Sequence, residues 1–208
     1  MTKNMGSVDG IKILALGDSL TAGYGVGAGE SLPDVLEKLL VEKGFEVAFI
    51  NAGVSGDTAA GGLARLDRLM DMRFDAAILE FGTNDALMGL PPNHVQSALE
   101  EIVIRLKERD IKVMLAGASP LGTGGREYDA EFSRIYEELA RRYDLELYPF
   151  ILEGVLENPG LTLPDGLHPN KEGVRVMAEG MLPTVARLIE QVMDKKGGAW
   201  SEIGRASC

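Results

Sequence analysis

The sequence predicts an α/β protein, built as a three-layer α/β/α sandwich around a five-stranded parallel sheet. Short apolar runs alternate with longer amphipathic segments along most of the chain. Strands that are separated by helices pair in parallel through right-handed crossovers, which places helices on both faces of the sheet. The 208 residues are enough for one domain with a substantial core, and no internal repeat or linker divides them.

The apolar runs predict the strands and the amphipathic segments predict the helices. The predicted strands are Ile11–Leu16, Glu46–Ile50, Ala76–Phe81, Lys112–Ala116 and Leu145–Tyr148. The predicted helices are Ser31–Lys43, Thr58–Met70, Asn93–Arg109, Glu127–Tyr143 and Lys171–Met193. In the first helix, leucine and valine recur at helical spacing until Gly44 ends the pattern. We expect the domain to cover residues 11–194, with a flexible N-terminus at 1–10 and a disordered, glycine-rich tail at 195–208.

Polar motifs follow the first three predicted strands. Ser19 comes after the first, Gly56 after the second and Asn84 after the third. Because ligands of open parallel sheets bind beyond the carboxyl ends of the strands, we expect these motifs to converge on one edge. The segment 149–169 is long for a loop in a compact domain, and such loops often carry function.

Ser19 is the predicted nucleophile, with His168 as its base and Asp165 as the group that orients the base. A serine hydroxyl attacks well at neutral pH only when a base removes its proton, and the base needs a partner that fixes its tautomer. The chain contains two histidines, and of these His168 has an acid three residues before it, in a turn signalled by Asp165-Gly166. Pro169 suits the first position of the following helix. His94 lies in a predicted first helical turn and is not expected to act in catalysis.

Four segments, in order along the chain, resemble the blocks of the SGNH (GDSL) hydrolases. They are Gly17-Asp18-Ser19-Leu20, Asn51-Ala52-Gly53-Val54-Ser55-Gly56-Asp57-Thr58, Gly82-Thr83-Asn84-Asp85 and Asp165-Gly166-Leu167-His168. The sequence is most similar to the bacterial arylesterase and acyl-thioesterase/lysophospholipase I branch. The resemblance covers roughly residues 11 to 190 and implies a flavodoxin-like SGNH hydrolase fold.

The resemblance also implies an oxyanion hole made of the Ser19 amide, the Gly56 amide and the Asn84 side chain. Fixed donors of this kind stabilise the charge that develops on a tetrahedral oxygen. The residues alone leave Gly53 and Gly56 open as the donor, and the family pattern selects Gly56. Asp57 is expected to cap the helix that follows. Asp18 and Asp85 are interpreted as hydrogen-bond acceptors that shape the loops, since a charge beside a forming oxyanion would oppose it.

Composition excludes several other classes of function. A net charge of −11 disfavours nucleic acid or an anionic membrane as a partner. The single cysteine, Cys208, allows no intrachain disulfide and no thiolate metal site. The expected serine mechanism requires no metal and no cofactor, so none is expected. The glycines at 23–29 lack the dinucleotide-binding spacing and are interpreted as a flexible lining of the substrate cleft. No apolar stretch approaches a transmembrane span or a signal peptide, so the sequence as given indicates a cytoplasmic protein, or a periplasmic or secreted one if a leader has been removed.

We therefore expect a serine esterase that hydrolyses small aryl or alkyl carboxylic esters through an acyl-enzyme. The family resemblance extends the expected substrates to thioesters and lysophospholipids. Two alternatives remain open: a carbohydrate O-deacetylase on the same fold, and a domain that binds a ligand without catalysis. The expected partner is a small-molecule ester, without stable membrane insertion, and assembly into a homo-oligomer is left open.

Overall fold

A five-stranded parallel sheet forms the centre of the molecule. The computed structural model describes residues 10–122 and 124–197, so the predicted flexible ends lie almost wholly outside the described residues. In spatial order the strands are β2 (Val47–Gly53), β1 (Ile11–Gly17), β3 (Ala76–Glu80), β4 (Lys112–Ala116) and β5 (Glu146–Tyr148). Every neighbouring pair is parallel, which confirms the predicted fold class.

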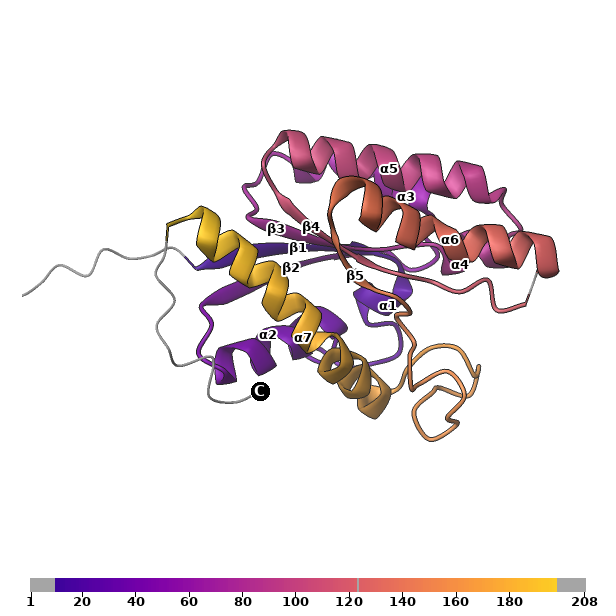
Figure 1. Ribbon diagram of the computed structural model, residues 1–208. Helices are drawn as coiled ribbons and strands as arrows, with labels where there is room; N and C mark the ends of the chain where they lie inside the picture. The colour runs from indigo at the N-terminus through magenta and orange to yellow at the C-terminus, as the bar shows by residue number, and fades with distance from the viewer. Residues whose placement is uncertain (1–9, 123, 198–208) are drawn as a thin grey trace, which may run out of the picture.

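Five long helices cover the two faces of this sheet (Figure 1). They are α2 (Leu32–Glu42), α3 (Ala59–Leu69), α5 (Pro92–Glu108), α6 (Arg126–Tyr143) and α7 (Lys171–Lys195). Helices α3, α5 and α6 lie on one face, and α2 and α7 lie on the other. Each face has its own apolar core, because the strand residues point alternately to the two sides. The result is the three-layer sandwich that the alternation of elements predicts.

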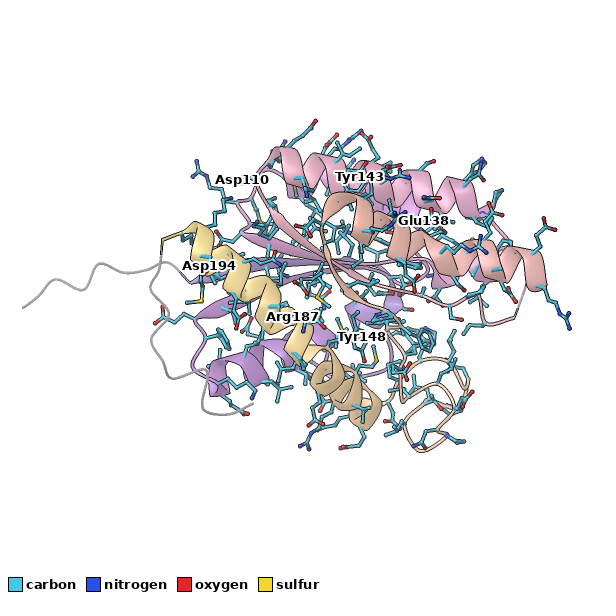
Figure 2. The ribbon with its side chains drawn as sticks, in the orientation of Figure 1. Asp110, Glu138, Tyr143, Tyr148, Arg187 and Asp194 are labelled. Carbon is cyan, nitrogen blue, oxygen red and sulfur yellow. The ribbon has the colours of Figure 1, made fainter. Side chains whose placement is uncertain are left out.

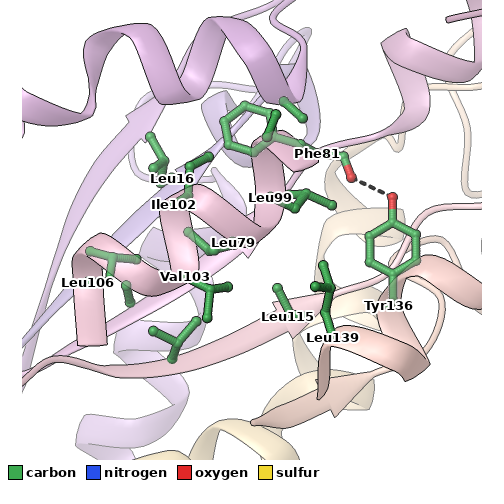
Figure 3. Close-up of a cluster of buried hydrophobic side chains, with 14 of the residues drawn as sticks. Leu16, Leu79, Phe81, Leu99, Ile102, Val103, Leu106, Leu115, Tyr136 and Leu139 are labelled. Atoms are coloured by element: carbon green, nitrogen blue, oxygen red, sulfur yellow. Dashed lines mark hydrogen bonds between the residues drawn. The ribbon is translucent and has the colours of Figure 1, made fainter. Parts of the chain in front are cut away.

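The core under α5 and α6 shows how these layers are packed (Figure 3). Leu79 of β3 and Leu115 of β4 meet Leu99 and Ile102 of α5, and all four are almost completely buried. The cluster includes one polar contact, in which the buried Tyr136 hydroxyl donates to the Phe81 carbonyl oxygen over 2.7 Å. This bond anchors α6 to the residue that directly follows β3, the strand that leads to Asn84.

Helix α7 closes the other face and reaches the edge strand β5. Figure 2 shows Arg187 and Tyr148 in this region. The Arg187 guanidinium donates to Glu146 of β5 over 2.9 Å, and Gly180 leaves room for the Tyr148 hydroxyl. Among the described residues, no helix combines the length and the apolar character that crossing a bilayer requires.

The structure adds elements that the sequence patterns do not predict and moves some boundaries. Two short helices, α1 (Ser19–Ala22) and α4 (Thr83–Leu87), directly follow β1 and the end of β3. Strand β2 runs to Gly53, three residues beyond the predicted end, and pairs with β1 along all seven residues. Helix α7 begins at Lys171 with Asn170 as its N-cap, so the expectation that Pro169 opens this helix is wrong. Pro169 instead forms a bridge with Thr162.

The order of the strands in the sheet indicates where a ligand would bind. The order β2-β1-β3-β4-β5 reverses direction between β1 and β3, where the first crossover runs one way and the second the other. Ligands in such sheets bind at this reversal, outside the carboxyl ends of the strands. Ser19 follows β1 and Asn84 follows β3, so both lie at the reversal point.

Candidate active site

The nucleophile turn joins β1 to α1. Strand β1 ends at Gly17, and Asp18 caps α1 by accepting the Leu20 amide on Oδ1 over 2.9 Å. Ser19 is therefore the first residue of a short helix, where a backbone N–H has no partner within the helix. It is 8% exposed, so its hydroxyl lies at the floor of the site.

A chain of two hydrogen bonds links Ser19, His168 and Asp165. The Ser19 Oγ lies 2.9 Å from His168 Nε2, and His168 Nδ1 lies 2.7 Å from Asp165 Oδ2. The carboxylate fixes the imidazole so that Nε2 faces the hydroxyl. This is the relation that a serine nucleophile, a general base and an orienting acid require.

The long loop before α7 delivers His168 and Asp165 as one rigid unit. Leu163 N–H donates to the His168 carbonyl over 2.7 Å, next to the antiparallel bridge between Thr162 and Pro169. The turn between Asp165 and His168 contains Gly166 at φ +71°, a conformation that favours glycine. The prediction of a functional loop at 149–169 agrees with this geometry.

Asp165 is held as an anion by its own turn. Its Oδ1 accepts the backbone N–H groups of Leu167 and His168 over 2.9 and 3.0 Å. The Leu167 amide, followed by the His168 side chain, lowers the pKa of Asp165 to about 2. The group that orients the base therefore stays charged throughout the neutral range.

Gly56 lies in an open turn next to the nucleophile. The turn starts at Val54, whose N–H donates to the Gly17 carbonyl over 3.0 Å, and closes with a bond from Asp57 N–H to Val54 O. Gly56 has φ +82°, and a Cβ placed there would meet nothing within 4 Å. The open space beside Gly56 lets a substrate approach this turn, as a site for an oxyanion donor requires.

Asn84 lies beside the same turn, but its amide hydrogens already have acceptors. Its Nδ2 donates to Asp18 Oδ2 and to the Asp57 carbonyl, each over 2.9 Å. A substrate oxygen would have to share or replace one of these bonds. The oxyanion role of Asn84 therefore stays a prediction, with this condition added to it.

Two acidic residues next to the site act as hydrogen-bond acceptors, as the sequence suggests. Asp85 accepts the Ala59 amide with both oxygens, over 3.1 and 3.3 Å, at the start of α3. Burial raises the pKa of both Asp18 and Asp85. The expectation that Asp57 caps α3 is wrong, because the Thr58 hydroxyl accepts the Gly61 amide and is the N-cap.

Asp57 pairs instead with Arg65, a residue whose role the sequence does not reveal. The Arg65 Nε donates to Asp57 over 2.8 Å, and its Nη2 donates to the Gly17 carbonyl over 3.1 Å. Arg65 thus ties the Gly56 turn to the end of β1.

Tyr24 is a second residue of the site that sequence reasoning missed. Its ring centroid lies 4.5 Å from that of His168, with the planes tilted by 44°. The ring comes from the glycine-rich segment 23–29, whose sequence predicts only a flexible lining of the cleft, and no local pattern connects positions 24 and 168. His94 is exposed on α5 and forms no part of the Ser19–His168–Asp165 chain.

The described residues contain no group of three or more histidine, cysteine or acidic side chains arranged to hold a metal ion. Cys208 lies outside the described residues. The reactive groups assembled at the strand ends are thus a hydroxyl, an imidazole, a carboxylate and backbone amides. Their arrangement suits nucleophilic acyl transfer.

Comparison with known proteins gives a consistent result. Residues 15–176 match the model of the GDSL-like lipase/acylhydrolase family. The chain is 38% identical to an arylesterase of Vibrio mimicus, over 81% of this chain and 84% of the relative. It is 34% identical to the thioesterase 1/protease 1/lysophospholipase L1 of Escherichia coli strain K12, over 85% of this chain and 84% of the relative. Among solved structures it is similar to AlinE4, an esterase of the SGNH-hydrolase family, with a TM-score of 0.73, 41% identity and coverage of 86% and 96%.

Proposed function

Because the chain belongs to the GDSL-like lipase/acylhydrolase family and is a carboxylic-ester hydrolase, we propose that Ser19 carries the acyl group in a covalent intermediate. The observation that supports this role is the continuous chain from Ser19 through His168 to Asp165, with contacts of 2.9 and 2.7 Å. The position of Ser19 at the strand reversal supports it further, as does the open space beside Gly56.

In acylation, Ser19 Oγ attacks the ester carbonyl carbon while His168 Nε2 takes its proton. The carbonyl oxygen becomes an oxyanion that accepts from the backbone N–H groups of Ser19 and Gly56 and from the Asn84 side chain. As the intermediate collapses, His168 gives the proton to the departing alcohol oxygen and the acyl group stays on Ser19. Asp165 keeps the imidazole oriented and stabilises its charged form.

Deacylation repeats these steps with water. His168 takes a proton from a water molecule, whose oxygen attacks the acyl carbon. Collapse of the second intermediate returns the proton to Ser19 Oγ and releases the carboxylic acid. The imidazole thus acts as a base and then as an acid in each half of the cycle.

We propose an apolar acyl or aryl group as the preferred substituent of the substrate. Large apolar side chains stand exposed on the turn and on the short helix α4 that carry the predicted donors. Val54, two residues before Gly56, is 47% exposed, while Leu87 and Met88, just after Asn84, are 49% and 61% exposed. Tyr24, against His168, is 52% exposed. Contact with an acyl chain would remove this surface from water, at about 25 cal/mol per Å² buried.

A panel of substrates tests both parts of this proposal. We expect kcat/KM to rise from p-nitrophenyl acetate through butyrate to octanoate, and acyl-CoA and lysophosphatidylcholine to be hydrolysed at Ser19. We expect Met88→Ser to flatten the dependence on acyl length. Met72→Ser is the matched control. Met72 is also exposed, at 46%, but it precedes β3 and therefore lies at the amino ends of the strands, away from the site at their carboxyl ends. A preference for acetylated sugars over all chain lengths would favour the O-deacetylase alternative.

A further inference from the structure

Glu80 is a buried carboxyl group that the reaction described above does not use. It ends β3, whose other residues are alanine, isoleucine and leucine, and it is 1% exposed. In the sheet register Glu80 stands directly opposite Gly17 of β1. The group therefore lies directly beneath the turn that presents Ser19.

One oxygen of this carboxyl group holds the nucleophile turn. Glu80 Oε2 accepts the Asp18 backbone N–H over 3.2 Å and the Thr21 hydroxyl over 2.9 Å. These two donors flank Ser19 in sequence, so the carboxyl group is bonded to the turn on both sides of the nucleophile.

Gly17 has the size that this contact demands. A Cβ at Gly17 would lie 2.6 Å from Glu80 Oε2 and 2.1 Å from the Thr21 hydroxyl oxygen. Neither atom could stay in place beside such a carbon. Gly17, Thr21 and Glu80 therefore form one packed unit that any side chain at position 17 would break.

The surroundings of Glu80 favour its neutral form. Its second oxygen, Oε1, has no hydrogen-bond partner among the described residues, and no lysine or arginine in that part of the chain is bonded to it. An unpaired buried charge is very costly. Burial, and then the neighbouring Asp18, raise the pKa of Glu80 well above its usual value. Tyr136 is a further titratable group near it, since burial, Asp85 and Glu80 together raise the pKa of Tyr136 well above its usual value.

Asp18 is the better place for the negative charge of this pair. Its two oxygens accept from the Leu20 amide and from the Asn84 side chain, each over 2.9 Å. Burial raises the pKa of Asp18 above its usual value, but less than that of Glu80, and the Leu20 amide, the Glu80 side chain and His168 all act to lower it. A neutral Glu80 leaves an anionic Asp18 to orient the Asn84 amide.

We propose that Glu80 is a positioning residue, a neutral carboxyl group that fixes the Asp18–Thr21 turn and thereby the Ser19 hydroxyl and the Asn84 amide. This inference rests on the roles proposed above for Ser19 and Asn84. It predicts that Glu80 affects turnover through geometry and through its lack of charge, without touching the substrate.

Two substitutions separate geometry from charge. Glu80→Gln keeps a carbonyl oxygen for both donors and is neutral at every pH, so we expect its kcat to stay within about threefold of the wild type. Glu80→Ala removes the acceptor, and we expect kcat to fall by about 10- to 100-fold with KM changed less than twofold, since small misplacements of reacting groups have effects of this order. Ile78→Ala is the control for lost stability, because Ile78 is buried in the same strand but has no side-chain group that could accept from Asp18 or Thr21.

Unfolding measured against pH tests the neutral form without any assay of activity. A carboxyl group whose pKa is higher in the folded than in the unfolded state binds more protons when folded, so its effect on stability worsens as the pH rises above the unfolded value of about 4.5. We expect wild type to lose stability relative to Glu80→Gln as the pH rises above about 4.5. This comparison also serves if the alanine variant does not fold.

Several results would overturn the proposal. A kcat for Glu80→Ala equal to that of Ile78→Ala would show that the turn does not need the acceptor. A Glu80→Gln variant with a kcat as low as that of Glu80→Ala would show that Glu80 acts as an anion. The same conclusion would follow if the stabilities of wild type and Glu80→Gln changed equally with pH. Activity retained by Ser19→Ala would instead overturn the proposed site, and the unfolding comparison would still report on Glu80.

Discussion

Replacing Asn84 with alanine should lower turnover and stability for two separable reasons. If the amide donates to the oxyanion, its loss should reduce kcat by about 10²–10³, or about 2.7–4 kcal/mol, as when one such donor is removed elsewhere. KM should change little, because the bond is strongest in the transition state. The same substitution leaves Asp18 Oδ2 and the Asp57 carbonyl without the donor that each now has at 2.9 Å.

The structural part of this effect can be estimated from burial. Asp18 is 0% exposed in the intact protein, so its Oδ2 depends on the Asn84 side chain for a donor. An acceptor left unsatisfied in the interior costs about 1–3 kcal/mol, and the variant should unfold at a correspondingly lower urea concentration. Turnover must therefore be expressed per folded molecule, from p-nitrophenyl butyrate kinetics and urea unfolding under identical conditions.

Asp85→Ala is the matched control for this prediction. Asp85 follows Asn84 in sequence and accepts the Ala59 amide, but an ionised carboxylate has no hydrogen to donate to an oxyanion. Its loss resembles removal of a helix cap and should cost about 0.5–2 kcal/mol of stability with kcat per folded molecule nearly unchanged. Asn84→Ala with kcat within about threefold of wild type, beside a large effect of Asp85→Ala, would refute the assignment of the oxyanion donor.

Three further predictions concern the base, its partner and metal ions. In ester hydrolysis assays His168→Ala should lose most activity, whereas His94→Ala should keep most of it. Equal losses in the two variants would mean that the wrong histidine is assigned as the base. Asp165→Ala should be less stable than wild type at neutral pH. This difference in stability should disappear as the pH falls from 3.8 through about 2, because the wild-type carboxylate then takes up its proton. Urea unfolding of both proteins at pH 7, 4 and 2 measures the difference. A gap that persists at pH 2 would contradict a role for the charge. Dialysis against EDTA should leave activity unchanged, whereas loss that a divalent metal ion restores would overturn the metal-free mechanism.

Most of the framework could be predicted because its signals are local. Strand β4 matches its predicted bounds, and α2 begins and ends within one residue of prediction, since apolar periodicity and capping residues lie within each segment. Asp165 and His168 are three residues apart around a glycine turn, so a short stretch of chain nearly fixes their pairing. Helices α1 and α4 span only four and five residues, too short to show a period.

The contacts that tune the site could not be predicted because they join distant segments. The Tyr24 ring meets His168 across 144 positions, and Arg65 reaches the Gly17 carbonyl across 48. Neither residue has a neighbour in sequence that signals its partner. The cap of α3 was misassigned for another reason: Asp57 and Thr58 both suit an N-cap, and the salt bridge with Arg65 engages Asp57.

Covalent labelling of Ser19 tests the central claim most directly. The protein would be treated with a fluorophosphonate or alkyl phosphonate probe, digested and examined by mass spectrometry, beside the Ser19→Ala variant. We expect a single adduct on the peptide that contains Ser19, loss of esterase activity in proportion to labelling, and neither labelling nor activity in the variant, which should unfold at nearly the same urea concentration as wild type. An adduct on another serine, or ester hydrolysis that persists in Ser19→Ala, would contradict the assignment of the nucleophile.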